Sequence, residues 1–381
     1  MEQKNRQTEP QKPVVWIHSA SAGEFEQAMP IILALRETYG DGIRIVLTFF
    51  SPSGYEPNQH NKCADEILYL PLDSKKNAQK LIKHINPTVA IFIKYEFWYH
   101  YFNQLKQQNV RLLVVSTVFR SSQYFFRPLT KRFGKATLAC VNHFFVQNES
   151  SKQGLATLGF TNATVSGDTR FERVVELSWQ QVENKLMNRF CQNASVVVAG
   201  STWRADENLL IETLSLLPKN FKLMLIPHEV NENNLKRLKK SIKNALFYSQ
   251  IDKNTDIEKH NVLIVDKVGM LSKLYFWAKY SFVGGGFDKG IHNTLEAAVY
   301  GRPLFFGINY KKFEEAKTMI EQQSAFSVSD SGQLRREIMR LEADGLARQG
   351  IKIRQKQYIN SSLGATKKIL EYLEPLLCVD I

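Results

Sequence analysis

Several patterns that mark common kinds of site are missing from this sequence. The four cysteines lie far apart and form no C-x-x-C pair, and the eight histidines show neither H-x-x-x-H nor H-E-x-x-H spacing. A disulfide framework and a zinc site are therefore not expected. No D-x-D occurs, which removes the usual carboxylate pair of a metal-dependent sugar-nucleotide site. The G-x-x-x-x-G-K-[ST] motif of a P-loop is missing as well.

Long hydrophobic runs are also missing. No run approaches the roughly 18 apolar residues that a membrane-spanning helix needs. Residues 1–13 are polar, contain no signal-peptide core and are expected to be a disordered lead-in.

The net charge, in contrast, is high at +13. This excess would suit nucleic acid, an anionic membrane or an anionic substrate. No nucleic-acid-binding motif accompanies it, so we do not expect a nucleic-acid partner.

The order of the predicted elements indicates two domains. A length of 381 residues already suggests about two cores. Short apolar runs alternate with helical stretches over residues 14–175 and again over 195–360, as in doubly wound parallel sheets. The charged stretch 176–194 is expected to be a linker. Residues 361–381 are expected to form a C-terminal helix that is able to cross back to the first domain.

The most informative stretch runs from Tyr280 to Pro303. A short apolar strand ends at Val283, three glycines follow at once, and His292-Asn293-Thr294 opens a helix. A glycine-rich loop before a helix N-terminus can bind an anion, because N–H groups and the helix dipole point at one place. The glycines at 284, 286 and 290 are spaced G-x-G-x-x-x-G and so miss the dinucleotide fingerprint. A tight turn without any ligand is therefore the alternative.

Polar residues follow the other predicted strands too. Ser19–Gly23 follows the first strand, and Lys94–Trp98 follows a later one. Open α/β sheets bind ligands at the carboxyl ends of their strands. Two such domains facing a cleft would be similar in layout to a GT-B glycosyltransferase. There, helix dipoles and basic side chains, rather than a metal, stabilise the departing phosphate.

At these motifs the chain resembles the 3-deoxy-D-manno-octulosonic acid (Kdo) transferases of lipopolysaccharide and lipid A biosynthesis, over nearly all of residues 14–375. The motifs that carry the resemblance are Ser19-Ala20-Ser21-Ala22-Gly23-Glu24, Glu96-Phe97-Trp98, Gln147-Asn148-Glu149, Ser166-Gly167, Phe282-Val283-Gly284-Gly285 and His292-Asn293-Thr294-Leu295-Glu296-Ala297-Ala298.

The resemblance implies a GT-B fold of two Rossmann-like domains, with no metal and no cofactor. It also implies that Kdo passes from CMP-Kdo to a hydroxyl of the lipid A precursor (lipid IVA), with inversion and release of CMP. The implied location is the cytoplasmic face of the bacterial inner membrane. Closure of the two domains around the nucleotide is a further expectation.

The resemblance also assigns roles in the first domain. Glu24 matches the general base; its alternative role is that of a first-turn carboxylate favoured by the helix dipole. Lys94 and Arg170 are expected to stabilise negative charge, or to bind the acid groups of Kdo or the acceptor phosphates. The alternative for each is a surface cation with its head in water. The residues expected to contact the acceptor are Ser21, Gly23 and Glu96.

Donor binding falls on three stretches of the second domain. The residues expected to contact CMP are Pro227, His228, Val268, Gly269, Met270, Asn293, Thr294, Leu295 and Glu296. Glu296 is expected to accept hydrogen bonds from ribose hydroxyls; its alternative role is that of a capping carboxylate.

Several positions depart from the family pattern. His228 stands where Arg is common, Lys94 and Met270 stand where Glu is common, and Arg170 stands where Lys is common. A neutral histidine still offers a hydrogen bond, and arginine and lysine differ in geometry. At position 270 only the backbone could replace the usual glutamate.

Members of this family usually begin with an apolar membrane anchor, which this sequence does not show. We therefore expect either a trimmed chain or peripheral contact with the membrane. The mixed apolar and basic stretches Phe119-Arg120, Tyr124–Arg127 and Lys131-Arg132 form the candidate contact face. The alternative is that these residues pack one helix face into the core.

Other functions stay open at this point. A GT-B transferase that uses a UDP-sugar is the main alternative. A catalytically inactive GT-B-like binding module is another, although the intact Glu24 argues against it. A nucleotide-dependent oxidoreductase is least supported, because the glycine fingerprint is missing.

Overall fold

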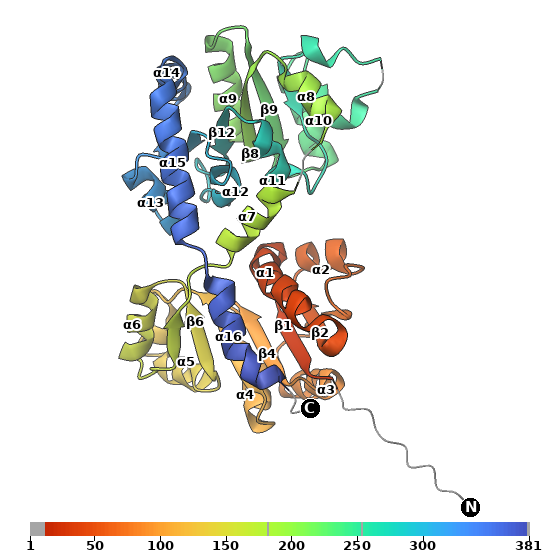
Figure 1. The fold of residues 1–381 in the computed structure, drawn as a ribbon, viewed down its shortest axis with the longest axis vertical. Helices are drawn as coiled ribbons and strands as arrows, with labels where there is room; N and C mark the ends of the chain where they lie inside the picture. The colour runs from red at the N-terminus through yellow and green to blue at the C-terminus, as the bar shows by residue number, and fades with distance from the viewer. Residues whose placement is uncertain (1–11, 181–182, 253, 379–381) are drawn as a thin grey trace, which may run out of the picture. The chain divides into compact units, whose positions relative to one another are not determined.

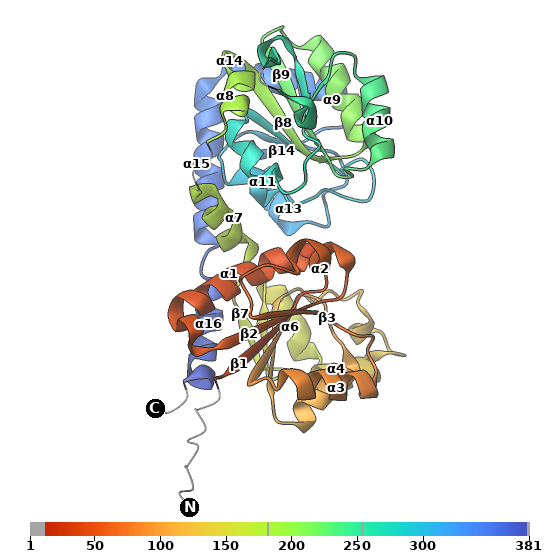
Figure 2. The same cartoon turned by 90° about the vertical axis from the view of Figure 1, so that its right-hand side faces the viewer.

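The computed structural model describes residues 12–180, 183–252 and 254–378. The chain divides into two compact units, unit 1 (residues 1–173 and 362–381) and unit 2 (residues 174–361). Each unit contains a sheet of seven strands that all pair in parallel (Figures 1 and 2). The predicted class, two doubly wound parallel-sheet domains, is confirmed. The cleft and its closure stay predictions. The expected lead-in, apart from Lys12 and Pro13, lies outside the described residues.

In unit 1 the strand order is β3-β2-β1-β4-β5-β6-β7, so the chain reverses direction across the sheet between β1 and β4. The elements are β1 (Val14–His18), α1 (Ala22–Tyr39), β2 (Arg44–Phe49), α2 (Pro52–Asn58), β3 (Glu66–Tyr69), α3 (Lys75–Ile85), β4 (Val89–Ile93), α4 (Tyr99–Gln107), β5 (Arg111–Thr117), α5 (Lys131–Leu138), β6 (His143–Val146), α6 (Glu149–Thr157), β7 (Ala163–Val165) and α16 (Ala365–Leu377).

Helices cover both faces of this sheet, which is why β1 and β4 are buried along their whole length. Helices α3, α4, α5 and α6 pack on one face, and α1 and α16 pack on the other. The last helix buries Ile369, Leu373 and Leu377, an i, i+4, i+8 stripe, against that second face. Its start is held by Glu172, whose carboxylate accepts from the backbone N–H of Gly364 at 2.8 Å.

In unit 2 the strand order is β10-β11-β9-β8-β12-β13-β14, with the reversal between β8 and β12. The elements are α8 (Lys185–Cys191), β8 (Ser195–Thr202), α9 (Arg204–Leu216), β9 (Phe221–Pro227), α10 (Glu232–Ser241), β10 (Leu246–Phe247), β11 (Val262–Ile264), α11 (Leu271–Leu274), β12 (Tyr280–Val283), α12 (Leu295–Ala298), β13 (Leu304–Phe306), α13 (Glu314–Glu321), β14 (Ala325–Ser327), α14 (Ser331–Ala343) and α15 (Gly345–Ser361).

The expected linker has secondary structure of its own. Helix α7 (Arg170–Trp179) carries the chain from unit 1 into unit 2. Helix α8 then buries Met187 and Phe190 within unit 2. Residues 176–194 thus fall inside the second unit. In unit 1, helix α2 is capped by Ser51, whose hydroxyl accepts from the N–H of Ser53.

The glycines after β12 bring three strand ends into backbone contact. A Cβ atom on Gly284 would lie 2.4 Å from the carbonyl oxygen of Ser201, at the end of β8. A Cβ on Gly286 would lie 2.5 Å from the backbone nitrogen of Gly307, just after β13. No side chain fits in either place, so close packing of backbone already explains these glycines.

We expect Gly286→Ala to lower the free energy of unfolding by about 1–3 kcal/mol, because the new methyl must push two loops apart. Gly42→Ala is the matched control: its Cβ would meet nothing within 4 Å, so its effect should stay within about 0.5 kcal/mol. Urea unfolding followed by circular dichroism measures both. Equal midpoints for the two variants would contradict the close packing of the loops.

Candidate functional site

In unit 2, aromatic rings gather at the carboxyl ends of β8, β9 and β12. Trp203 follows β8, His228 follows β9, and His292 lies after the glycine loop of β12. The rings of Trp203 and His228 stack with centroids 4.8 Å apart, and those of His228 and His292 stack at 4.2 Å. This cluster lies where the strand order reverses, the place at which open α/β sheets bind ligands.

The hydrogen bond between Trp203 and His292 determines the protonation of the histidine. Trp203 Nε1 lies 3.0 Å from His292 Nε2. An indole N–H can only donate, so His292 Nε2 must be the acceptor and the ring proton sits on Nδ1. Burial, with the neighbouring His228 as a smaller cause, lowers the pKa of His292 to about 4. At neutral pH this residue is therefore an uncharged donor through Nδ1.

Asp206, in the first turn of α9, holds the glycine loop in place. One carboxylate oxygen, Oδ2, accepts from the N–H of Gly285 and from that of Trp203, each at 2.8 Å. The side chain is buried, and its other oxygen has no hydrogen-bond partner among the described residues. Burial raises the pKa of this carboxyl group, although the two N–H donors oppose the shift. The Gly285 N–H, which the sequence offers to a ligand, is thus used within the protein.

The residues expected to bind CMP lie at this carboxyl edge, but they form separate groups. Asn293 Nδ2 donates to Glu296 Oε1 at 2.9 Å, and Asn293 Oδ1 accepts from the N–H of Leu295 at 3.2 Å. The Asn293 side chain therefore links the first backbone N–H of this short helix to the Glu296 carboxylate. Thr294 and Leu295 are buried, which leaves Asn293 and Glu296 as the polar side chains of the motif with access to a ligand.

The remaining donor-site candidates lie on neighbouring strand ends. Pro227 is the buried last residue of β9, and His228, directly after it, is exposed and belongs to the ring stack. Val268 is 79% exposed in the loop after β11, where Gly269 has a φ of 84°. The half-buried Met270 directly precedes α11.

In unit 1 a chain of hydrogen bonds leads from the core to the carboxyl edge. Trp16 Nε1 donates to Thr48 Oγ1 at 3.0 Å, and Thr48 Oγ1 lies 2.9 Å from Nδ1 of the buried His18. The Thr48 hydroxyl accepts from the indole, so its own proton is available for His18 Nδ1. This arrangement favours a proton on His18 Nε2, which has no hydrogen-bond partner within the described chain. Glu96 Oε2 lies 3.8 Å from that nitrogen.

Glu24 and Glu96 lie near this histidine. Burial lowers the pKa of His18, and the charges of Glu96 and Glu24 oppose that shift. Glu24 lies in the first turn of α1 and accepts a hydrogen bond from the Ser21 hydroxyl. Glu96 accepts from Trp98 Nε1 at 2.8 Å. The structure therefore brings the expected base and one expected acceptor residue to the same edge of the sheet.

The other expected residues of unit 1 have different surroundings. Lys94 directly follows β4 with a φ of 64°, and its ammonium group lies 5.9 Å from the centre of the Tyr95 ring. A Cβ on Gly23 would meet only the Ser21 hydroxyl, at 3.8 Å, so there is open space above the first turn of α1.

Arg170 forms an ion pair with the buried Asp168, with N–O distances of 2.7 and 2.8 Å. Gln27 donates to the other oxygen of Asp168 at 2.9 Å. Burial alone would raise the pKa of Asp168, but Arg170 and Gln27 lower it below its usual value. The charge of Arg170 is thus largely balanced within unit 1. Asp168 and Gln27 escape sequence reasoning because 141 residues separate them.

Two kinds of feature are missing from the described parts of the chain. There, no group of three or more His, Cys, Asp or Glu side chains could hold a metal ion. Within the same residues, no helix combines the length and apolar character needed to cross a bilayer.

The low pKa of His292 predicts a pH dependence of stability. Its folded pKa of about 4 lies below the ordinary 6.5. Between these values the unfolded chain binds more protons, so the free energy of unfolding falls as the pH drops from 6.5 toward 4. His292→Gln should show a smaller fall, because glutamine does not titrate.

Urea midpoints at pH 7.5 and pH 4.5 test this expectation. The exposed His60 provides a control, His60→Gln, which should keep the pH dependence of the wild type. The same drop in midpoint for all three proteins would contradict the assignment of a neutral, buried His292.

Comparison with known proteins gives this geometry a context. Residues 1–173 match the family model described as 3-deoxy-D-manno-octulosonic-acid transferase (kdotransferase). The 3-deoxy-D-manno-octulosonic acid transferase of Rickettsia felis is 28% identical over 333 residues, 85% of this chain and 70% of that protein. That of Chlamydophila psittaci is 26% identical over 304 residues, 77% of this chain and 69% of that protein.

A longer relative comes from Fusobacterium nucleatum. Its bifunctional glycosyltransferase/methyltransferase is 27% identical over 337 residues, which are 83% of this chain and 50% of that protein. The present chain thus spans half the length of this relative.

Among solved structures, UDP-GlcNAc 2-epimerase from Neisseria meningitidis, bound to UDP-GlcNAc, superimposes with a TM-score of 0.68 at 16% identity. The match covers 95% of this chain and 100% of that one. At this identity the likeness shows the fold alone, which is the GT-B glycosyltransferase-like fold. Taken with the sequence relatives, these findings show that the chain is a relative of the 3-deoxy-D-manno-octulosonic acid transferases and is a glycosyltransferase.

Proposed function

We propose that this protein transfers Kdo from CMP-Kdo to a hydroxyl of a lipid A precursor (lipid IVA), with inversion and without a metal. The observation that carries this proposal is the placement of Glu24. The carboxylate lies in the first turn of α1, at the carboxyl edge of the unit 1 sheet, with open space beside it at Gly23. It also lies within residues 1–173, the part of the chain that matches the transferase family model.

In this mechanism Glu24 acts as the general base. Its carboxylate takes the proton of the acceptor hydroxyl as that oxygen attacks the anomeric carbon of Kdo. The bond from the anomeric carbon to the phosphate oxygen breaks, and its electron pair leaves with CMP. The Ser21 hydroxyl holds the carboxylate by donating to it. Glu96, held by Trp98 and facing His18, is suited to accept from a second hydroxyl of the acceptor sugar.

The donor would bind at the carboxyl edge of unit 2. Glu296 and Asn293 form a polar pair suited to the ribose hydroxyls of CMP. His292 presents an uncharged Nδ1–H at neutral pH, and the exposed ring of His228 stacks on it. These two rings would give hydrogen bonds and a stacking surface where relatives commonly supply an arginine. The phosphate of CMP would then be bound by uncharged hydrogen-bond donors such as His292 Nδ1–H, and not by a fixed positive charge at position 228.

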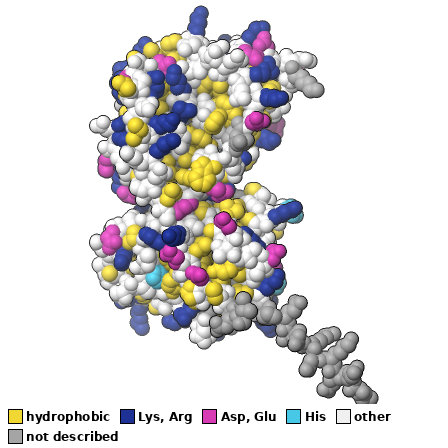
Figure 3. All heavy atoms as spheres, viewed as in Figure 1, with side chains coloured by type: hydrophobic (Ala, Val, Ile, Leu, Met, Phe, Trp, Pro, Cys, Tyr) yellow, Lys and Arg dark blue, Asp and Glu magenta, His cyan; other side chains and the backbone are white. Residues whose placement is uncertain are grey.

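We also propose that the protein contacts the membrane peripherally. On the face drawn in Figure 3, Lys and Arg side chains are scattered among acidic and apolar ones. The sequence, however, concentrates positive charge in residues 97–148, which contain no Asp or Glu. The cations in this stretch are Lys106, Arg111, Arg120, Arg127, Lys131, Arg132 and Lys135. Each well-placed cation adds about 1 kcal/mol of attraction to an anionic lipid surface.

The residues that contact lipid in this proposal differ from those expected. Phe119 and Phe125 are 4% and 1% exposed and pack in the core, so that part of the predicted face is wrong. Leu129, in contrast, is 99% exposed, and Phe133 is 54% exposed. Both lie among Arg127, Lys131 and Arg132, around the start of α5. Two exposed apolar side chains among basic residues are suited to insert between anionic lipid headgroups.

Glu24→Gln should lower kcat by about 10²–10⁴-fold, because the amide cannot accept the proton. The assay uses CMP-Kdo generated in place, with a tetraacylated lipid A precursor as acceptor. Glu37→Gln, an exposed carboxylate on the same helix, is the control and should keep wild-type activity. Equal turnover by Glu24→Gln and wild type would remove Glu24 from the mechanism.

The double variant Leu129→Ser/Phe133→Ser should bind vesicles of phosphatidylethanolamine and phosphatidylglycerol at least about tenfold more weakly, since two apolar side chains no longer insert. Leu346→Ser is the control, because Leu346 is 87% exposed but lies in unit 2. Vesicle co-sedimentation at low and high salt measures the binding of the double variant and of the control. Unchanged binding by the double variant would contradict this contact surface.

A further inference from the structure

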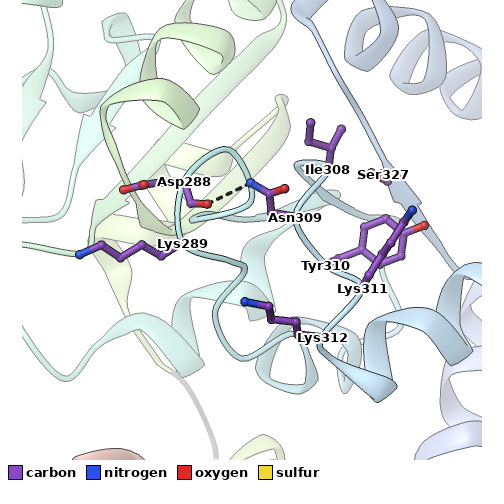
Figure 4. Close-up of a pocket in the computed structure, with 8 residues that line it drawn as sticks. All are labelled: Asp288, Lys289, Ile308, Asn309, Tyr310, Lys311, Lys312 and Ser327. Carbon is purple, nitrogen blue, oxygen red and sulfur yellow. Dashed lines mark hydrogen bonds between the residues drawn. The ribbon is translucent and has the colours of Figure 1, made fainter. Parts of the chain in front are cut away.

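Unit 2 contains a cavity that none of the roles above uses. It has a volume of about 670 Å³ and lies at the carboxyl ends of β12, β13 and β14 (Figure 4). Its lining comes from the loop after β12, the loop after β13 and the end of β14. The lining residues are Asp288, Lys289, Ile308, Asn309, Tyr310, Lys311, Lys312 and Ser327.

Asn309 ties the two loops that line this cavity together, through one hydrogen bond from its backbone and one from its side chain. The N–H of Asn309 donates to the carbonyl of Gly286 at 2.8 Å, and Asn309 Nδ2 donates to the carbonyl of Asp288 at 2.9 Å. Beneath them, the Phe313 ring fills the space beside Gly290, where a Cβ would lie 3.0 Å from it. The cavity is thus built on a fixed frame, as ligand sites commonly are.

The charge in this cavity is mainly positive. Three lysines face one carboxylate, that of Asp288. Lys289 and Lys311 are exposed and form no ion pair with any other residue that the structure describes. In Figure 4 the side chains of Lys289 and Lys312 extend to one side of the two loops, whereas Lys311 lies on the other side with Tyr310 and Ser327.

The end of the cavity at Lys311 combines three kinds of polar group. Lys311 supplies an ammonium, and Tyr310 supplies a phenol hydroxyl that can donate. The Ser327 hydroxyl donates to the carbonyl of Gly307 at 3.4 Å, so its oxygen is left as an acceptor. Ile308, 53% exposed, adds an apolar surface. This combination suits a ligand that carries an anionic group, hydroxyls and a short apolar stretch.

We propose that this cavity holds the acidic sugar of the donor, with the sugar carboxylate bound by Lys311 and Tyr310. The inference rests on the proposed function. An octulosonic acid carries a carboxylate, several hydroxyls and, when 3-deoxy, a methylene group that Ile308 can contact. Asp288 and Lys289 belong to the same loop as Gly284–Gly286, so the cavity lies next to the proposed nucleotide site. A phosphate of the acceptor is the other anion that these groups could bind.

Steady-state kinetics with each substrate varied in turn distinguishes the two anions. Lys311→Gln should raise the KM for CMP-Kdo about tenfold or more, because a charge-assisted hydrogen bond is lost, and should leave the acceptor KM unchanged. Lys311→Arg should restore the donor KM to within about threefold, since the charge returns. Tyr310→Phe should raise the donor KM less than Lys311→Gln does. Lys317→Gln, outside the cavity and paired with Glu314, is the control and should match wild type.

An unchanged donor KM in Lys311→Gln would overturn the proposal, whether the acceptor KM stays the same or rises; a rise would show that Lys311 binds a phosphate of the acceptor instead. Either result leaves the proposed function standing, because wild type still turns over CMP-Kdo. Failure of wild type to use CMP-Kdo would instead remove the proposed function. Saturation-transfer NMR with free Kdo and mannose then tests the cavity alone. Kdo binding by wild type that is lost in Lys311→Gln supports the proposal, whereas equal binding or none overturns it.

Discussion

The buried carboxylate of Asp206 is the contact on which the carboxyl edge of unit 2 depends. It joins the first turn of α9 to the glycine loop after β12, by accepting from the backbone N–H groups of Trp203 and Gly285. With the loop held there, His292 comes within hydrogen-bond distance of Trp203. At Gly284 and Gly286 the backbones of neighbouring strand ends lie so close that no side chain fits between them. The rings, the polar pair of Asn293 and Glu296, and the lysine-lined cavity all lie on this frame.

In unit 1 a buried histidine, His18, lies at the carboxyl edge of the sheet. His18 ends a fully buried strand, and hydrogen bonds from the core fix its ring. Its remaining nitrogen faces Glu96, and Glu24 is close enough to influence its pKa. The half-buried Ser21 and Trp98 hold Glu24 and Glu96 by hydrogen bonds at this sheet edge, and the buried His18 lies beside Glu96. A carboxylate at such an edge can take a proton from a hydroxyl, which is the role proposed for Glu24.

Much of this arrangement is readable from the sequence, because short apolar runs and glycines report local structure. The strands around Val89–Ile93 and Tyr280–Val283 were predictable for that reason. Contacts between distant residues were not: the roles of Asp206 and Asp168 depend on partners 79 and 141 residues away. Local pattern also fails to tell Phe125 from Leu129, since both lie in a mixed apolar and basic stretch. Only the three-dimensional structure shows that Phe125 belongs to the core, where its ring contacts those of Phe97 and Phe119.

The central claim is that this glycosyltransferase uses CMP-Kdo as its donor and a lipid A precursor as its acceptor. The most direct test is mass spectrometry of the product formed by the wild-type protein, in detergent, with CMP-Kdo and with UDP-sugars offered in parallel reactions. We predict that the acceptor gains the mass of one or more Kdo residues with CMP-Kdo and not with a UDP-sugar. This gain should persist when a metal chelator is present. A mass shift from a UDP-sugar, or no shift with any donor while the protein remains folded, would contradict the account.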